Sequence, residues 1–146
     1  MNTGFLLSET ISDEACIFRI MLNLADDFYN RTVDKTVLAK KLSQYGVFKK
    51  ATIDGEIAGF IGYYANDLES GMAYLSTIVI TKKYQGRGIG TLLLHECLDD
   101  CRNRGMTTCR LEVDKNNMSA ITFYKRFGFA NEKVASEMSD YYICKL

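Results

Sequence analysis

The feature that most restricts the fold is a β-branched segment that runs into a glycine-rich turn and then into an amphipathic helix. Residues 74–80 read Tyr-Leu-Ser-Thr-Ile-Val-Ile, and the turn Gln85-Gly86-Arg87-Gly88-Ile89-Gly90 follows shortly after. From Gly88 to Arg104, apolar side chains recur at helical spacing. The segment therefore predicts a strand, a tight loop and a helix in succession, which is typical of an α/β protein.

The glycine-rich turn has the composition of an anion site. Glycines let the backbone approach a ligand closely, and they leave several N–H groups pointing in one direction. The beginning of a helix adds partial positive charge, so a phosphate or pyrophosphate is the favoured ligand. Arg87, which lies between two glycines, could either pair with a phosphate or extend into solvent.

Three families of glycine-rich loop compete for this turn. A P-loop requires Lys followed by Ser or Thr after its last glycine, whereas Thr91 and Leu92 follow Gly90. A dinucleotide-binding fingerprint requires G-x-G-x-x-G, whereas the glycines here are spaced G-x-G-x-G. The remaining pattern, Q-x-x-G-x-G, resembles the pyrophosphate-binding loop of the GNAT acetyltransferases.

A second motif further along the chain resembles the same family. It consists of Leu111-Glu112-Val113, Asn117, Ala120 and the run Phe123-Tyr124-Lys125-Arg126-Phe127-Gly128-Phe129. The two motifs occur in the family's order, and the resemblance covers residues 73–130. One departure is the absence of the proline often found before the loop, where this chain has Lys82-Lys83. That change is expected to alter the turn and not the anion site.

The resemblance implies an α/β fold of the GNAT type: a central, mixed, splayed β-sheet flanked by about four helices, in a single domain spanning residues 1–146. It also implies acetyl-CoA as the acyl donor, without a metal. Backbone groups of Ile78, Val79 and Ile80 are then expected to pair with the pantetheine arm. The expected pyrophosphate cradle is Gln85, Gly86, Arg87, Gly88, Ile89, Gly90 and Thr91. Asn117 and Tyr124 are expected near the pantetheine and thioester.

Two residues of the second motif are candidates for proton transfer. In similar enzymes the tyrosine that matches Tyr124 donates a proton to the departing CoA thiolate. The alternative is a packing role, since Ala120, Phe123, Tyr124 and Phe127 form a stripe on one helix face. Asn117 also has two interpretations, as a ligand of CoA or as the N-cap of this helix.

Glu112 is the candidate general base. It lies twelve positions before Tyr124, a spacing that also occurs in the GNAT enzymes that acetylate ribosomal-protein termini. Strand alternation places it opposite Leu111 and Val113, and a carboxylate there could accept the proton of an ammonium group, directly or through water. The alternative is an ordinary surface glutamate on a half-exposed strand.

The rest of the chain predicts further helices and strands. A helix capped by Ser12 or Asp13 is expected to bury Ile17, Ile20, Met21 and Leu24, and a second is expected across 33–42 with Val37, Leu38 and Leu42 inward. Strands 47–53 and 56–64 flank Asp54-Gly55, a hairpin turn. Strands 73–80 and 107–113, a helix 118–127 and two short strands, 129–134 and 138–146, complete the prediction.

Composition limits the partners and the compartment. Eighteen basic and eighteen acidic residues balance, so a nucleic-acid partner is not expected. No apolar stretch is long enough to span a bilayer, and the N-terminus lacks the features of a signal peptide. The five cysteines have no metal-ligand spacing, and Cys97 and Cys101 are interpreted as buried thiols on one helix face. These features favour the cytoplasm. The C-terminal strand, with Tyr141, Tyr142 and Ile143, is a candidate for pairing across a homodimer.

The predicted function is acetyl-CoA-dependent transfer of an acetyl group to a primary amine of a small molecule or peptide. The amine attacks directly in a ternary complex, Glu112 removes a proton, Tyr124 supplies one to sulfur, and a strand amide at Val79 holds the oxyanion. Two alternatives stay open: a non-catalytic CoA-binding sensor or subunit, and an acyltransferase that uses another acyl group or a hydroxyl acceptor.

Overall fold

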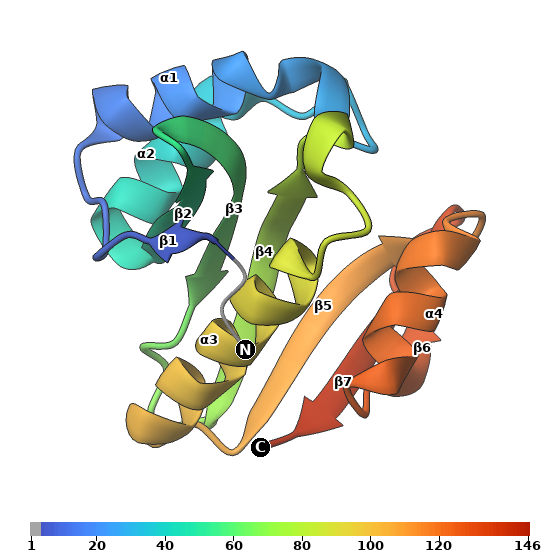
Figure 1. Ribbon diagram of the computed structural model, residues 1–146. Coiled ribbons are helices and arrows are strands. Elements are labelled where there is room, and N and C mark those ends of the chain that lie inside the picture. Colours follow the sequence, from blue (N-terminus) through green and yellow to red (C-terminus); the bar gives the residue numbers. More distant parts are fainter. Residues whose placement is uncertain (1–3) are drawn as a thin grey trace. The chain divides into compact units, whose positions relative to one another are not determined.

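The computed structural model describes residues 4–146, within which seven strands and four α-helices form a mixed α/β fold (Figure 1). The strands follow the hydrogen-bonded order β1-β2-β3-β4-β5-β7-β6. β4 and β5 are parallel, whereas β1–β2, β2–β3, β5–β7 and β6–β7 are antiparallel. The predicted mixed sheet is confirmed. The elements are β1 (Leu6–Leu7), α1 (Glu14–Asn23), α2 (Lys35–Tyr45), β2 (Val47–Ile53), β3 (Glu56–Tyr64), β4 (Met72–Ile80), α3 (Ile89–Asn103), β5 (Thr108–Asp114), α4 (Met118–Arg126), β6 (Ala130–Val134) and β7 (Ser139–Lys145).

The chain divides into two compact units, each built from two segments. Unit 1 comprises the chain up to Tyr64 together with Thr77–Cys97, and unit 2 comprises Ala65–Ser76 together with Leu98–Leu146. β4 and α3 are therefore each divided between the units. A single domain over residues 1–146 stays a prediction. Residues 1–3, which belong to the N-terminus expected to lack a signal peptide, lie outside the described residues.

The core of unit 1 lies between its two N-terminal helices and the β2–β3 hairpin. Asp13 caps α1 by accepting a hydrogen bond from the Cys16 N–H at 2.8 Å, which satisfies one of the free amides of the first turn. The predicted inward side chains of α1 are all buried. These four side chains are part of a larger apolar cluster, whose buried members are Ile17, Ile20, Met21, Leu24, Phe28, Ala39, Leu42, Phe48, Phe60 and Val79.

The prediction for the second helix is partly wrong. Asp34 caps α2 by accepting from the Val37 N–H at 3.1 Å, so the helix begins at Lys35, later than expected. With this phase, Ala39 and Leu42 are buried, whereas Val37 is 54% exposed. A helix face repeats about every 3.6 residues, so Val37 cannot share the face that presents Ala39.

The hairpin of unit 1 forms where the sequence predicts it. Asp54 and Gly55 have φ angles of 51° and 78°, which a two-residue hairpin turn of this kind requires. Further along β3, a Cβ atom on Gly59 would lie 2.7 Å from the Val79 carbonyl oxygen. Only glycine therefore permits β3 to lie this close to the end of β4.

Unit 2 packs α4 against one face of the β5–β7 pair. Cys109 lies opposite Cys144 in the register, and the Cys144 thiol donates to the Phe127 carbonyl at the end of α4, at 3.4 Å. Burial raises the pKa of this thiol. Gly128, with φ 93°, follows the helix, as predicted for its stop.

The strand order corrects one prediction about self-association. β7 lies between β5 and β6 and pairs with both, so its edges are occupied. The expected pairing of Tyr141, Tyr142 and Ile143 across a homodimer is therefore wrong for that strand. The edge strand on this side of the sheet is β6, whose residues are all exposed.

Candidate active site

The end of β4 provides the first part of the candidate site. The register between β4 and β5 covers Met72–Leu75, whereas β4 continues to Ile80. Ile78, Val79 and Ile80 therefore lie on the stretch of β4 beyond this register. The Val79 side chain is buried in the unit 1 core, so packing holds this part of the strand in place.

The glycine-rich turn adopts the conformation that an anion site requires. Gly86 and Gly88 have φ angles of 80° and 82°, a region that other residues rarely adopt. A Cβ atom on either glycine would meet no atom within 4 Å, so the space beside the turn is open. α3 begins at Ile89, and its first amides have no partner within the helix. Gly86 to Thr91 thus present backbone N–H groups at a helix N-terminus, a site suited to pyrophosphate.

Gln85 connects the turn to the strand before it. Its side-chain amide donates to the Ile80 carbonyl oxygen at 3.2 Å. Residues 82–84 between them form a 3₁₀ turn, and the Lys82 N–H donates to Asp27 Oδ1 at 3.0 Å. These contacts order the turn where many similar chains have a proline.

A set of contacts around Tyr84, next to the turn, was not predicted. The buried Tyr84 donates its hydroxyl proton to Glu56 Oε2 at 2.9 Å, and the Lys83 ammonium lies 3.0 Å from the same oxygen. The hydrogen bond from Lys83, followed by that from Tyr84, lowers the pKa of Glu56. The exposed Arg87 guanidinium lies over the Tyr84 ring, 5.4 Å from its centroid. Tyr84 therefore joins the β2–β3 hairpin to the only arginine of the turn.

Unit 2 carries the candidate general base. Glu112 lies on β5, and the alternation of buried and exposed residues places its side chain on the face opposite Leu111 and Val113, as predicted. Glu112 Oε2 accepts a hydrogen bond from the Ser139 hydroxyl at 2.5 Å. This partner is 27 residues away and was missed in the sequence.

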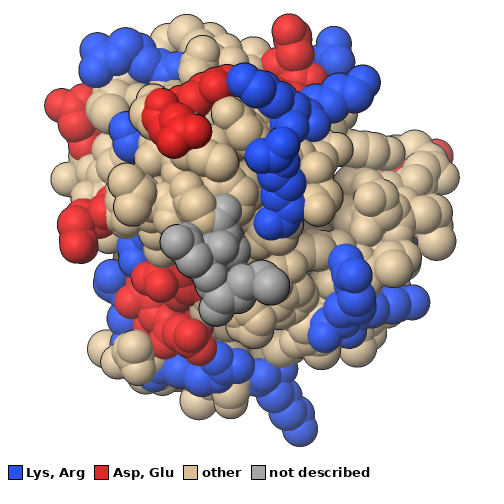
Figure 2. All heavy atoms as spheres, in the orientation of Figure 1, with Lys and Arg blue, Asp and Glu red and all other residues tan. Residues whose placement is uncertain are grey.

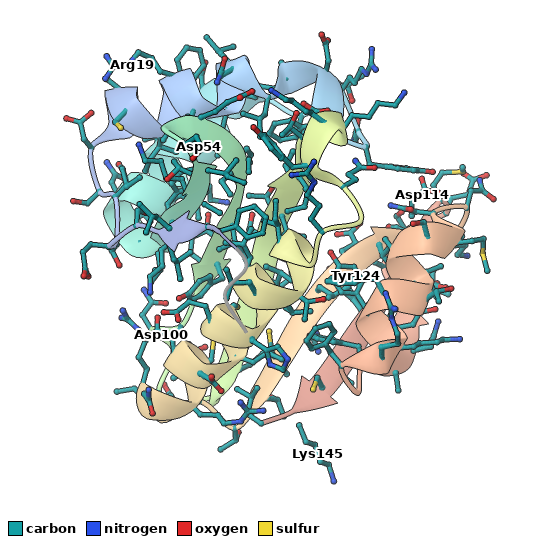
Figure 3. The ribbon with its side chains drawn as sticks, in the orientation of Figure 1. Arg19, Asp54, Asp100, Asp114, Tyr124 and Lys145 are labelled. Atoms are coloured by element: carbon teal, nitrogen blue, oxygen red, sulfur yellow. The ribbon has the colours of Figure 1, made fainter. Side chains whose placement is uncertain are left out.

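Tyr124, labelled in Figure 3, lies on α4. Its ring is buried, with its centroid 5.5 Å from that of Phe123 and 5.7 Å from that of Phe129, and these contacts fix the ring. The predicted stripe is partly confirmed: Tyr124 is buried together with Ile121, which was not predicted, whereas the other members are half-buried, namely Ala120, Phe123 and Phe127. Asn117 precedes α4 as its N-cap, because its side-chain oxygen accepts from the Ala120 N–H at 3.3 Å.

The predicted residues thus form two groups. Unit 1 brings together the strand residues 78–80 and the turn 85–91, and unit 2 contains Glu112, Asn117 and Tyr124. Within unit 2, one face of the β5–β7 pair carries Cys109 and Cys144 and contacts α4. Glu112 lies on the other face of the pair.

The remaining ionisable residues do not form a second constellation. Asp13 caps α1, and Asp27 accepts from the backbone N–H of Lys82. Glu14 lines a groove of about 300 Å³ with Ala15, Phe18, Thr36 and Ala39. His95 is exposed, as predicted. Cys97 and Cys101 are buried and form no disulfide. Residues 4–146 contain no group of three or more metal-ligating side chains and no helix that is long and apolar enough to cross a membrane.

Comparison with known proteins agrees with these observations. The model of the Acetyltransferase (GNAT) family matches residues 16–129. The chain belongs to this family. The structure of the ribosomal-protein-S18-alanine N-acetyltransferase of Escherichia coli superposes with a TM-score of 0.78 and 21% identity, covering 97% of this chain and 93% of that one. The PaiA N-acetyltransferase of Thermoplasma acidophilum, in complex with coenzyme A, gives a TM-score of 0.77 and 18% identity over 97% and 99% of the two chains.

Curated relatives match a smaller part of the chain. N-alpha-acetyltransferase 30 of Schizosaccharomyces pombe is 40% identical over 60 residues, which are 41% of this chain and 40% of that protein. The ribosomal protein bS18-alanine N-acetyltransferase of E. coli is 32% identical over 66% of this chain and 62% of the relative. The chain spans about two fifths to one half of the first curated relatives, at 40%, 38% and 52% of their lengths.

Proposed function

We propose that this GNAT protein is an acetyl-CoA-dependent N-acetyltransferase, which transfers an acetyl group to a primary amine of a small molecule or peptide. The observation that carries the proposal is the turn at Gly86 and Gly88, with positive φ angles, open space and the beginning of α3 behind it. A backbone cradle of this kind suits the pyrophosphate of a CoA thioester. Family membership and the residue Tyr124 support transfer over simple binding.

The donor is proposed to bind along unit 1. Backbone groups of Ile78, Val79 and Ile80 extend beyond the register of β4 with β5, so a pantetheine arm can pair with them as an added strand would. The turn from Gln85 to Thr91 receives the pyrophosphate, and Arg87 adds positive charge. Asn117, besides capping α4, is assigned to the pantetheine end of the site.

The transfer step is assigned to three groups of this chain. Glu112 accepts a proton from the acceptor ammonium, which frees the nitrogen lone pair to attack the acetyl carbonyl carbon. The Val79 amide donates a hydrogen bond to the carbonyl oxygen as negative charge develops there. As the carbon–sulfur bond breaks, the Tyr124 hydroxyl gives its proton to the thiolate. The nitrogen loses its second proton to solvent, which leaves the neutral amide, and the tyrosinate is reprotonated from solvent.

Location and assembly belong to the same proposal. None of the five cysteines, all of which lie within residues 4–146, forms a disulfide, which suits a reducing compartment, so we place the enzyme in the cytoplasm. A homodimer formed by strand pairing would use the β6 edge. Light scattering tests this, and a monomer at micromolar concentration would exclude pairing through β6.

The proposal is tested by following release of free CoA thiol from acetyl-CoA with a panel of primary amines, including N-terminal peptides, polyamines, amino acids and amino sugars. Turnover with at least one amine is expected. CoA binding without turnover on any acceptor would identify a binding module, and turnover with hydroxyl acceptors alone would identify the other acyltransferase class. Absence of CoA binding would refute the proposal.

A further inference from the structure

Ser139 is an unusual residue in the described part of the chain. It begins β7, and among residues 4–146 it is the one polar, non-aromatic side chain that is buried, with 8% of its surface exposed. A buried hydroxyl is costly unless it makes hydrogen bonds. Its partners therefore indicate why a serine occupies this position.

Two oxygens contact the Ser139 hydroxyl. It donates to Glu112 Oε2 at 2.5 Å, and it lies 2.7 Å from the Ser136 hydroxyl. Ser136 is itself held in place, because its oxygen accepts from the Met138 N–H at 3.2 Å. The amides of Ala135 and Ser136 also donate to the Ser139 carbonyl oxygen. The result is a short chain of hydroxyls that ends on the carboxylate of Glu112.

The strand register explains how Ser139 reaches Glu112. Tyr141 lies directly opposite Glu112, and Ser139 lies opposite Asp114, so Ser139 and Glu112 are diagonal neighbours on one face. Side chains at diagonal positions are close enough to interact across an antiparallel pair. A serine two residues before the opposed position can therefore hold the glutamate from the side.

The other charged groups around Glu112 have partners of their own. On β5, Arg110 forms a bidentate ion pair with Glu132 of β6 and lies over the Tyr141 ring of β7. Asp114, the next residue on the same strand face, accepts from the Asn116 N–H at 2.8 Å. Lys133 of β6 lies opposite Tyr141. The hydrogen bond to Glu112 that the structure describes comes from Ser139.

We propose that Ser139 is the positioning residue of the general base, with Ser136 fixing its hydroxyl, an inference that rests on the proposed role of Glu112. Donation from Ser139 occupies Oε2 and leaves Oε1 to accept the proton of the acceptor amine. Ser136 orients the hydroxyl and has a smaller effect.

The test compares kcat and KM at one pH near neutrality for the parent, Ser139→Ala, Ser139→Thr and Ser136→Ala. In Ser139→Ala, kcat is expected to fall about tenfold, the size expected for a hydrogen bond to a charged group. The KM for acetyl-CoA is expected to stay unchanged. Ser139→Thr keeps a hydroxyl and is expected to restore kcat, whereas Ser136→Ala is expected to lower it slightly.

A second measurement separates this inference from the proposed function. Carboxyl-carbon NMR at one fixed pH should show a changed Glu112 signal in Ser139→Ala and a signal like that of the parent in Ser139→Thr, whether or not an acceptor is known. Ser43→Ala, whose hydroxyl contacts only the Lys40 carbonyl oxygen on α2 among the described contacts, is the matched control and should leave both readouts unchanged.

The outcomes are distinguishable. If Glu112→Gln lowers kcat but Ser139→Ala leaves both kcat and the Glu112 NMR signal as in the parent, Ser139 has no positioning role and the base assignment stands. If Glu112→Gln leaves kcat unchanged, the assignment of Glu112 in the proposed function is wrong. The first conclusion requires a folded Ser139→Ala protein, checked by circular dichroism, and Ser136→Ala replaces it should it unfold.

Discussion

The two units of this protein carry their candidate functional groups in different ways. In unit 1 the proposed groups are backbone amides, set by Gly86, Gly88 and the beginning of α3. In unit 2 they are side chains, the carboxylate of Glu112 and the phenol of Tyr124, each held by neighbours. The proposed binding groups of unit 1 should therefore be sensitive to backbone conformation, and the proposed catalytic groups of unit 2 to the loss of single atoms.

The electrostatic character of the units follows the same division. In unit 1, Lys83 and Arg87 lie beside the turn, and both contact the ring of Tyr84. In unit 2, Arg110 and Glu132 neutralise each other, which raises the pKa of the guanidinium and lowers that of the carboxyl group. The face drawn in Figure 2 shows basic and acidic side chains interspersed, in agreement with the balanced composition. The proposed anion site therefore depends on the local arrangement of groups and not on net charge.

The largest effect is expected from a change of backbone conformation in the turn. Gly88→Val places a β-branched residue at φ 82°, where strain amounts to about 1–3 kcal/mol and the turn is expected to relax into another conformation. Calorimetric titration with CoA, in the presence of EDTA, should then detect no binding.

Gly105→Val is the matched control for this substitution. Gly105 has φ 88°, and a Cβ atom there would lie 3.6 Å from Leu68 Cδ2, an ordinary contact, but this glycine follows the end of α3 and not the turn. It should lose similar thermal stability while retaining CoA binding. Equal loss of CoA affinity in both variants would show that general destabilisation, and not the turn, accounts for the result.

In unit 2 a large effect is expected on turnover, with little effect on CoA binding. Tyr124→Phe removes one hydroxyl and keeps the ring that packs against Phe129, so turnover should fall about a hundredfold, as is typical for a general acid. CoA affinity should change little. Steady-state kinetics and calorimetry on one preparation measure both values, and an unchanged kcat would make Tyr124 a packing residue.

Glu112→Gln should have an intermediate effect that depends on pH. The amide cannot accept a proton, so kcat is expected to fall by about tenfold or more near neutrality, where an amine acceptor is mostly protonated. As pH rises, free amine becomes abundant and the variant should recover part of its activity. A hydroxyl acceptor would show no such recovery. Superimposable pH profiles of variant and parent would instead direct attention to ordered water or to another carboxylate.

The smallest effect is expected from the loss of the hydrogen bond between Tyr84 and Glu56. Tyr84→Phe removes the hydrogen bond to Glu56 but keeps the ring under Arg87, so CoA affinity should fall about fivefold, in line with the net contribution of one hydrogen bond. Tyr29→Phe, at an exposed position in the same unit, is the control. If Tyr84→Phe binds CoA as the parent does, the hydrogen bond between Tyr84 and Glu56 contributes nothing to CoA affinity. Side chains would then matter even less for binding in unit 1 than its contrast with unit 2 implies.

Local patterns in the sequence were sufficient to predict most helices and strands and the conformation of the glycine-rich turn. The hairpin at Asp54-Gly55, the helix N-cap at Asp13 and the stop at Gly128 each depend on contacts within a few residues, and all three are confirmed. The phase of α2 was misjudged at Val37, because the cap at Asp34 was not recognised.

The contacts that support the site could not be predicted in this way. Glu56 and Tyr84 are 28 residues apart, and Glu112 and Ser139 are 27 residues apart. Each pair depends on how one strand or turn lies against another, which periodicity does not encode. A serine or tyrosine in isolation carries no sign of such a partner.

The division of β4 between the two units has a consequence for synthesis on the ribosome. The parallel register that joins Met72–Leu75 to β5 requires Thr108–Leu111, more than thirty residues later in the chain. Until those residues emerge, the first half of β4 exposes unpaired backbone while the second half can already join the unit 1 core through Val79. The nascent chain thus passes through a stage with an open strand edge, the kind of surface on which chains aggregate. Slow translation of residues 90–110 would prolong that stage.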